Sequence, residues 1–181
     1  MISYVIVGTL ADLFCWILLQ THPLIIAIQV FLVYLSYYCI HRFVLHNMSF
    51  NPHVYVHHYK YFQVYRYVEL GIDFLFEMFS FAVVPLLLQY WSSIWIVPPT
   101  IVILITLFLS FCHLFNYSLL GSDVHKAHHT DSTTNFGPDF LDHLFGTNAS
   151  PEYEDTFQHI PALIQACIVT HFAKAYFQWK D

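Results

Sequence analysis

The sequence predicts an all-α integral membrane protein with about four transmembrane helices, arranged as two hairpins beneath a histidine-rich helical cap. The first reason is composition, because hydrophobic residues make up 57% of the 181 residues and charged residues only 10%. A soluble domain carries about 25% charged residues, which it needs to cover its surface. The other two reasons are four long apolar segments and the position of the histidines relative to them.

A transmembrane helix needs about 20 mostly apolar residues. Four segments meet or approach this length, and we expect them to form the spans: residues 3–20, 24–40, 74–91 and 94–112. Pro23 marks the turn between the first two segments, and Pro98 and Pro99 lie just inside the fourth. Pro85 predicts a kink in the third, where a neighbouring helix must replace the lost backbone hydrogen bond.

Two hairpins place both chain ends and the central segment on one side of the membrane. Neither hairpin turn carries a basic residue, and all six lie in 41–72 or after residue 112: Arg42, Lys60, Arg66, Lys126, Lys174 and Lys180. By the positive-inside rule, this side is the cytosol. We therefore expect a single membrane domain over 1–181, with cytosolic histidine-rich segments at 41–72 and 113–147 and with both termini in the cytosol.

A further helix is expected at about 157–178. Apolar residues recur there at helical intervals: Ile160, Leu163, Ile164, Cys167, Ile168, Phe172 and Ala175. The segment also contains His171 and several other polar residues. We interpret it as an amphipathic helix that lies in the membrane interface or packs on the cytosolic part, and not as a span.

Several functions and targeting signals are disfavoured. The few basic residues are scattered singly, so nucleic acid is not an expected partner. The four cysteines have no CxxC spacing, which indicates packing residues rather than disulfides or a thiolate metal site: Cys15, Cys39, Cys112 and Cys167. The first apolar segment has no basic region before it, so we expect it to remain as an anchor.

The histidines are concentrated at one face of the predicted topology. Eight of the 13 form three compact groups: His41 and His46; His53, His57 and His58; and His125, His128 and His129. The first two groups follow the second span and the third follows the fourth, so all three should meet. His113, at the cytosolic end of the fourth span, is a ninth candidate. We interpret the remaining four as interfacial anchors: His22, His143, His159 and His171.

The spacings suit metal binding. Residues three and four apart share a helix face, so His125 can point with His128 and His129, and His53 with His57. Five residues turn a helix by about 140°, so His41 and His46 require the helix to end or unwind, or they bind different metals. Neutral imidazole binds iron, zinc, copper and nickel. Because a tetrahedral zinc site takes only four ligands, eight or nine histidines indicate a dinuclear site. A pair of haems is the alternative, and it would leave half of the histidines unused.

The histidine groups are accompanied by a second motif. The segments "YYCIHRFVLH", "HVYVHH", "HKAHH" and "NFGPDFLDHLFGT" resemble the histidine boxes of the fatty acid hydroxylase/sterol desaturase superfamily. Histidine boxes alone also occur in acyl desaturases and alkane hydroxylases, so the final motif narrows the choice. Its elements here are Asn135-Phe136-Gly137, Asp142 and Phe145-Gly146-Thr147, and Leu141 stands where the family usually has tryptophan. The resemblance covers about residues 34–147.

The resemblance implies a membrane-bound, non-haem di-iron enzyme that uses O2 to hydroxylate or desaturate a lipid, whether fatty acyl, sphingoid or sterol. It also implies electrons from a cytochrome b5-type donor at the cytosolic face of the endoplasmic reticulum. The implied ligands of the two iron ions are His41, His46, His53, His57, His58, His125, His128 and His129, with His113 matching an additional histidine of the family. Zinc can replace iron in purified protein.

Other residues are candidates for supporting roles. A ligating imidazole usually donates its second N–H to a carboxylate or carbonyl, and five side chains near the third histidine group could accept it: Asp123, Asp131, Asn135, Asp139 and Asp142. Asp123 and Asp131 also fit ordinary solvated loop acids, and Asn135 fits either a ligand or an orienting group. A lipid would enter from the bilayer past aromatic residues, although helix packing and an aromatic belt explain most of these: Tyr34, Tyr37, Tyr38, Phe74, Phe76 and Phe79.

Two other kinds of metal-dependent membrane protein remain as alternatives. A zinc hydrolase would need a general base beside the metal, and no HExxH motif is present. A metal or haem carrier would place ionisable residues along the middle of the spans. Only Asp12, Asp73 and Glu77 lie in or near the spans, mostly at their ends.

Overall fold

The computed structural model describes residues 2–47, 53, 66–154, 156–179 and 181. Within these residues every regular element is helical, which confirms the all-α class. The α-helices are α1 (Ile2–Leu19), α2 (Pro23–Cys39), α3 (Arg66–Met78), α4 (Val84–Ser92), α5 (Pro99–Cys112), α6 (Asp123–Thr130), α7 (Asp139–Phe145) and α8 (Ile160–Phe177). π-helical turns extend α2 and α5 and join α3 to α4: Ile40–Val44, His113–Leu120 and Phe79–Val83. Short 3-10 turns are Leu45–Asn47 and Thr156–His159.

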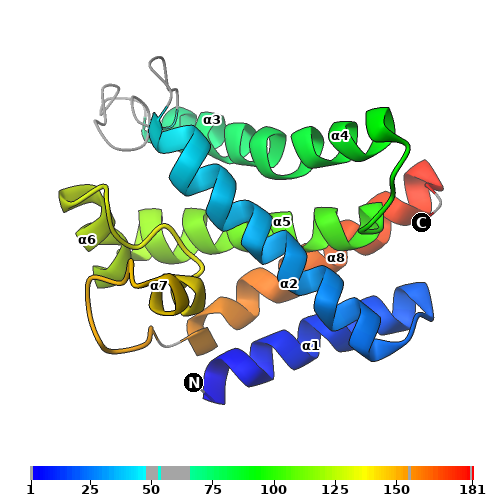
Figure 1. The fold of residues 1–181 in the computed structure, drawn as a ribbon, viewed down its shortest axis with the longest axis horizontal. Coiled ribbons are helices and arrows are strands. Elements are labelled where there is room, and N and C mark those ends of the chain that lie inside the picture. The colour runs from blue at the N-terminus through cyan, green and yellow to red at the C-terminus, as the bar shows by residue number, and fades with distance from the viewer. Residues whose placement is uncertain (1, 48–52, 54–65, 155, 180) are drawn as a thin grey trace.

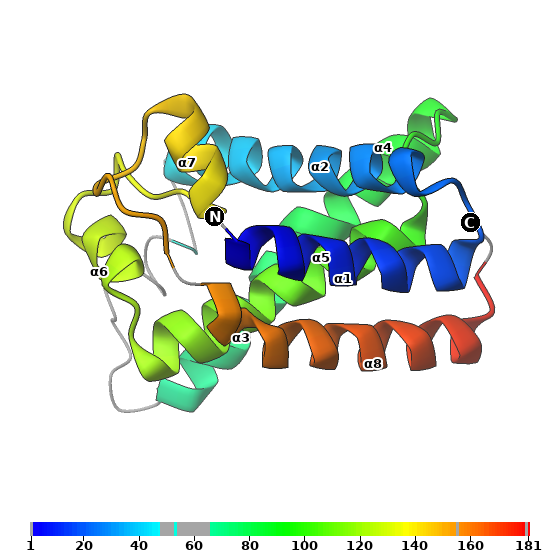
Figure 2. The ribbon, with the colours of Figure 1, turned by 90° about the horizontal axis from the view of Figure 1, so that it is seen from below.

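Helix α5 lies at the centre of the bundle. It packs against α2, α3 and α8, and most of its side chains are buried. Figure 1 shows the joined α3 and α4 on one side of α5, α1 and α8 on the other, and α2 crossing in front. The short helices α6 and α7 lie at one end of the bundle, where α2 and α5 end and α1 and α8 begin (Figures 1 and 2). We call this end the cap.

Three helices are long and apolar enough to cross a membrane: Pro23–Asn47, Tyr67–Ser92 and Phe157–Phe177. Two shorter apolar helices, Ser3–Leu19 and Pro99–Phe115, run beside them. Large apolar side chains on these helices face outward, among them Leu24, Leu75, Leu88 and Phe172. An apolar outer surface of this kind is consistent with an integral membrane protein, because soluble proteins rarely expose large contiguous apolar patches.

The third predicted span differs from the observed helix at its start. Helix α3 begins at Arg66, about two turns before the expected residue 74, so Asp73 belongs to the helix. The fourth predicted span, 94–112, begins late instead, because α5 starts at Pro99. Proline is favoured at the first helical position, where its missing N–H leaves no bond unmade. Gln89 fixes the preceding turn by accepting from the backbone N–H groups of Ile96 and Val97 at 2.9 Å each.

Helix α5 replaces the backbone hydrogen bond that is lost at Pro85. Pro85 follows the π-helical turn Phe79–Val83 and cannot donate a backbone hydrogen bond to the carbonyl of Phe81, four residues earlier. That carbonyl instead accepts a hydrogen bond of 3.1 Å from the hydroxyl of Thr106, which is fully buried on α5. Helix α4 therefore continues beyond the proline with the freed carbonyl satisfied by a neighbouring helix.

The C-terminal helix does not pack as its apolar pattern suggested. Helix α8 lies along α5 and presents small residues to the bundle, because Ala162, Ala166 and Thr170 are buried. Ile164 and Phe172, which belong to the predicted apolar pattern, point outward. Small residues let helices approach closely within a bilayer, where large apolar side chains are stable against lipid. The expected interfacial helix is therefore a helix that runs the length of the bundle.

The course of α8 also corrects the expected position of the C-terminus. Asp181 accepts hydrogen bonds from the backbone N–H and hydroxyl of Thr100, at 3.0 and 2.9 Å, and pairs with Lys174. Thr100 lies at the start of α5, at the end of the bundle remote from the cap. At the other end, the hydroxyl of Tyr4 donates to Asp139 of α7. The two termini therefore lie at opposite ends of the bundle (Figure 2), and not at the same end, where a pair of hairpins would place them.

Candidate metal centre

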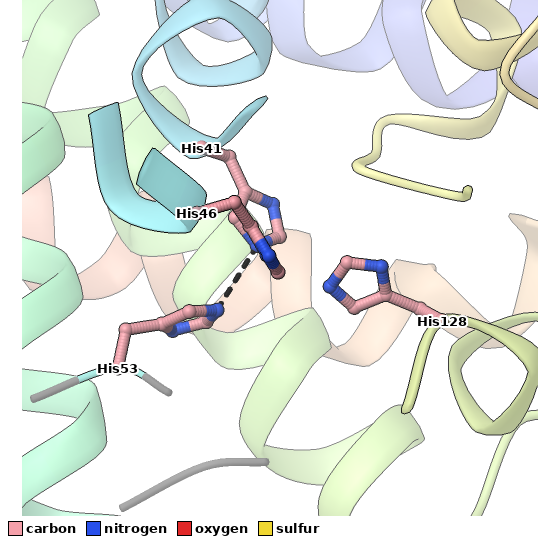
Figure 3. A group of neighbouring side chains, drawn as sticks. All are labelled: His41, His46, His53 and His128. Carbon is pink, nitrogen blue, oxygen red and sulfur yellow. Dashed lines mark hydrogen bonds between the residues drawn. The ribbon is translucent and has the colours of Figure 1, made fainter. Parts of the chain in front are cut away.

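Four histidines from three separate segments converge in the cap. His41 and His46 come from the end of α2, His53 from the segment that follows, and His128 from α6. Their candidate ligand nitrogens all lie within 4.8 Å of one another, and Figure 3 shows the four rings turned toward a common point. The Nε2 of His41 is 3.0 Å from the Nε2 of His53 and 3.2 Å from that of His46. We call these residues the first histidine group.

The π-helical turn explains how His41 and His46 meet. An α-helix would place residues five apart about 140° from each other. The turn Ile40–Val44 has the wider i to i+5 pattern, which stacks residues five apart on one face. The 3-10 turn Leu45–Asn47 then ends the helix at His46. The expected unwinding between these two histidines is thus present, and it brings both rings to the same side.

Backbone carbonyls orient two rings of this group. The Nδ1 of His41 lies 2.6 Å from the carbonyl oxygen of Phe136, and the Nδ1 of His128 lies 2.5 Å from that of Thr134. Because a carbonyl oxygen only accepts, each Nδ1 carries the proton and each Nε2 keeps its lone pair. The lone pairs are the ones that face the centre of the group.

A second histidine group lies beside the first. His113, at the start of the π-helical turn after α5, has its Nε2 3.2 Å from the Nε2 of His125. His129, one turn further along α6, places its Nε2 2.8 Å from that same atom. His125 and His128 connect the two groups, with ring centroids 6.0 Å apart.

Two buried carboxylates of α3 face the second group. Glu77 Oε1 lies 2.5 Å from the Nδ1 of His113, and Asp73 Oδ2 lies 3.6 Å from that atom. The other oxygen of Asp73 is 3.9 Å from the Nδ1 of His53, so Asp73 stands between histidines of the two groups. Sequence reasoning did not assign a role to either acid. The signal was present, because Glu69, Asp73 and Glu77 recur every four residues on one face of an apolar helix.

The candidate ligand atoms of the first group lie close enough together to hold one metal ion, and neighbouring nitrogens of the second group have similar separations. Two nitrogens bound to one cation at about 2.0–2.1 Å lie about 3.0–3.4 Å apart. The Nε2 separations of 3.0 and 3.2 Å in the first group and 3.2 Å in the second agree with this, and the 2.8 Å separation is slightly shorter. Burial, with a smaller effect of neighbouring imidazoles, lowers the pKa of His128 to about 3, against a backbone hydrogen bond that raises it. The ring is therefore neutral at pH 7, which is the form that binds metal.

Asp142 holds the part of the loop after α6 that carries the Phe136 carbonyl. This buried carboxylate accepts from the backbone N–H groups of Phe136 and Gly137, at 2.9 and 2.7 Å, and from the hydroxyl of Thr147 at 2.7 Å. Burial raises the pKa of Asp142 to about 6 against these hydrogen bonds, so the group is a carboxylate at pH 7. Asp142 thus fixes the backbone that orients His41, instead of touching a histidine itself.

Asn135 also has a structural role in this loop. Its side chain donates to the carbonyl of Val124 on α6 and accepts from the backbone N–H of Ala149, both at 2.9 Å. It therefore joins α6 to the loop, which supports the orienting role over the ligand role. Tyr38 of α2 reaches the same loop through the hydroxyl of Thr147, at 2.9 Å.

The remaining acids and histidines lie apart from the two groups. Asp139 accepts from Tyr4 and from the backbone N–H of Glu154. Asp123 pairs with Lys126 at the surface, and exposed Asp131 binds Thr133. Among the histidines expected to be anchors, His171 is exposed and His143 stacks on Tyr153 with ring centroids 3.9 Å apart. His22 accepts from the backbone N–H of Leu24, and His159 is buried near Glu154. The predicted ligands His57 and His58 lie outside the described residues.

An apolar cavity of about 370 Å³ lies between α1, α2 and α5 and reaches the cap. Two of its lining residues contact the histidine groups. The ring centroid of Tyr37 is 6.0 Å from that of His41, and Tyr117 stacks almost parallel on His125 at 4.8 Å. Val5 and Phe31 also line the cavity and are exposed, so it reaches the outer surface between α1 and α2. Of the expected aromatic lining, Tyr34 and Tyr37 take part, and Tyr38, Phe74, Phe76 and Phe79 do not.

Comparison with known proteins gives no relative for this chain. No protein-family model, curated protein or solved structure matches it.

Proposed function

We propose that this chain is a membrane-bound, non-haem di-iron oxygenase that hydroxylates or desaturates a lipid. The observation that carries the proposal is the pair of adjacent histidine groups, whose Nε2 atoms face inward at separations suited to metal binding. His41, His46, His53 and His128 would hold one iron. His113, His125 and His129 would hold the other, with His57 and His58 as the remaining candidates.

Bound iron would supply the reductive activation of O2, a chemistry that no side chain of the chain can supply. The residues around it have separate tasks. The carbonyls of Phe136 and Thr134 and the carboxylate of Glu77 keep three histidines in the tautomer that presents Nε2 inward. Burial of His41, His113 and His128 excludes water from the centre.

The lipid would come from the bilayer through the cavity between α1 and α2. Its apolar lining suits an acyl chain or a sterol, and Tyr37 and Tyr117 would position the reacting carbon near the two groups. Hydroxylation inserts one oxygen atom of O2 into a C–H bond and releases the other as water, and desaturation removes two hydrogens instead. Both need two electrons and two protons, for which we propose a cytochrome b5-type donor and solvent.

The orientation follows from the basic residues. Arg42, Arg66 and Lys126 belong to segments at the cap, and Lys174 lies at the opposite end. The positive-inside rule then places the cap and the N-terminus in the cytosol and the C-terminus across the membrane, with the endoplasmic reticulum as the proposed compartment.

Elemental analysis of anaerobically purified protein, combined with lipid analysis of expressing cells, tests this function. We expect about two iron ions per chain and a lipid that gains one oxygen or loses two hydrogens. His128→Ala should abolish the product, and His171→Ala, which changes an exposed histidine of α8, should not. Stoichiometric metal without any oxidised lipid would favour the metal carrier instead.

A further inference from the structure

One acid of the bundle, Asp12, has no role in the proposed oxygenase chemistry. Asp12 lies in the middle of α1 and lines the cavity. Its Oδ1 is buried, and none of the described residues donates a hydrogen bond to it. The other acids within the long helices have partners, because Asp73 and Glu77 face histidines.

An unpartnered carboxyl group at this depth is unfavourable. Burial of a polar group without a hydrogen bond is destabilising, and ionisable residues within spans mark functional sites by default. A purely structural acid would be expected to bind a donor on a neighbouring helix. Asp12 instead faces a space that a ligand can occupy, so its donor is expected on the ligand.

The cavity runs from the cap, where the histidine groups lie, along α1 to Asp12. The cavity follows α1 from Tyr4, beside the cap, to Asp12, eight residues further on, which corresponds to about 12 Å of helix. Tyr37 and Tyr117, which contact the histidine groups, line it as well. A ligand that fills the cavity therefore has one end near the histidines and the other near the carboxyl group of Asp12.

We propose that Asp12 accepts a hydrogen bond from a hydroxyl group at the end of the lipid remote from the histidine groups. The substrate class is then a lipid alcohol, with an apolar body about as long as the cavity and a reacting carbon at the opposite end. This inference rests on the proposed oxygenase function and narrows it, because an acyl chain without a hydroxyl would leave Asp12 unpaired.

The surroundings favour a hydroxyl over charged head groups. The cavity lining on α1 and α2 includes the apolar residues Gly8, Ala27 and Val30, together with Tyr34. An ammonium group there would have a single carboxylate to offset its loss of water, and removing a charge from water is strongly unfavourable. A lipid carboxylate would be repelled. A hydroxyl needs only one acceptor to be satisfied.

Photo-crosslinking in lipid nanodiscs tests the assignment without requiring iron. The probes are 1-dodecanol that carries a diazirine in its chain, its methyl ether and the corresponding primary amine. We expect the alcohol to label residues of α1 and α2 that line the cavity, with an affinity about three- to tenfold above that of the ether, which cannot donate. This comparison uses the unaltered protein, so it does not depend on the folding of a variant.

Variants of Asp12 provide the second comparison. Asp12→Leu removes the acceptor, and it should reduce the affinity of the alcohol about three- to tenfold while leaving that of the ether unchanged. Asp12→Asn keeps a carbonyl acceptor, and it should retain most of the binding. Thr9→Val is the control, because Thr9 lies on the same helix, outside the cavity lining, with its hydroxyl bonded to the carbonyl of Val5.

Equal affinities of alcohol and ether, or alcohol binding that survives Asp12→Leu, would overturn the proposal. Preferential binding of the amine, lost in Asp12→Asn, would also overturn it, since the acid would then recognise a cation. These results leave the oxygenase function standing if iron and an oxidised lipid are still found. Conversely, alcohol binding that depends on Asp12, together with the absence of any oxidised lipid in expressing cells, would refute the oxygenase and not the binding site.

Discussion

The carboxylate of Glu77 lies 2.5 Å from the Nδ1 of His113, and both side chains are almost fully buried, with exposed fractions of 2% and 7%. A carboxylate only accepts, so Nδ1 carries the proton and Nε2 is turned toward His125. Helix α3 thereby sets the orientation of a histidine that belongs to the end of α5. The pairing matches the carboxylate–histidine arrangement common around metals in proteins.

Replacement of Glu77 by glutamine should weaken iron binding. The loss of charge removes the strong acceptor for His113, and changes of this kind lower metal affinity about 10- to 100-fold. Titration of metal-free protein with ferrous iron under anaerobic conditions measures the effect. Glu152→Gln, at an exposed loop position, is the matched control and should bind iron as the unaltered protein does. Equal affinities for the two variants would remove Glu77 from the site.

Replacement of His128 by alanine should abolish oxidised product and lower the iron content by about one ion per chain. The first group would keep only three of its described imidazoles, and the Nδ1 hydrogen bond to Thr134 would be lost. Protease protection in membranes should be unchanged, because the spanning helices do not contain this residue. An active His128→Ala protein would contradict the assignment of the first group.

Replacement of Asp142 by asparagine should destabilise the cap by about 1–3 kcal/mol. The amide NH2 cannot accept one of the three hydrogen bonds that the carboxylate receives, and a buried donor is left unsatisfied. Denaturant unfolding followed in detergent measures the change. Asp123→Asn removes an acid whose side chain is 97% exposed, and its effect should be close to zero. An equally small effect for both would show that Asp142 does not hold the loop.

Thr106→Val should destabilise the helix pair α4–α5 by about 0.6–1.7 kcal/mol, since the carbonyl of Phe81 loses its donor. Pro85→Ala restores a backbone N–H at the position that an α-helix uses to reach this carbonyl. The cost of Thr106→Val should therefore be smaller in the Pro85→Ala background, as measured by a double-mutant cycle. Strict additivity of the two substitutions would disprove the compensation.

Acidification should destabilise the metal-free protein through His128. Its pKa is about 3 in the folded state against an ordinary 6.5, so between these values only the unfolded chain gains the proton. The free energy of unfolding therefore falls as the pH drops from 6.5 toward 3 and is level above 6.5. Asp142 acts in the opposite direction between 3.8 and about 6, because the folded state takes up that proton first.

Thermal unfolding of metal-free protein at pH 7 and pH 5 measures this dependence. His128→Asn should lose less stability between the two pH values than the unaltered protein, because the titrating ring is absent. The loaded protein should also release metal below about pH 6, since protons compete for the imidazoles. Full metal occupancy at pH 4 would argue against ligation by histidines alone.

The convergence of histidines was predictable from topology. His41 and His46 follow one apolar helix and His125, His128 and His129 follow another, and the structure brings members of both sets together. Asp73 and Glu77 were not given a role: the predicted span began at residue 74, which left Asp73 outside the helix, and Glu77 was counted only as an ionisable residue near the end of that span. The orienting carbonyls of Thr134 and Phe136 were also beyond prediction, since every residue carries a carbonyl and only the folded loop selects these two.

Helix α8 shows a different limit of sequence reasoning. Its large apolar residues were interpreted as one face of an amphipathic helix that lies in the membrane interface or packs on the cytosolic part. In a bilayer, the packed face is recognised by small residues, here Ala162, Ala166 and Thr170. The polar residues of the segment, among them His171, were the reason not to count it as a span, and both termini were therefore expected on one side.

The π-helical turn at Ile40–Val44 makes the relative positions of His41 and His46 sensitive to the deletion of a single residue. Deletion of one residue there would regularise the helix and rotate everything after it by about 100°. His46 would then swing away from His41 although each histidine, each hydrophobic residue and the helix itself remained. A homologous chain one residue shorter at this point could therefore keep the fold and every histidine, and still be unable to assemble the first histidine group.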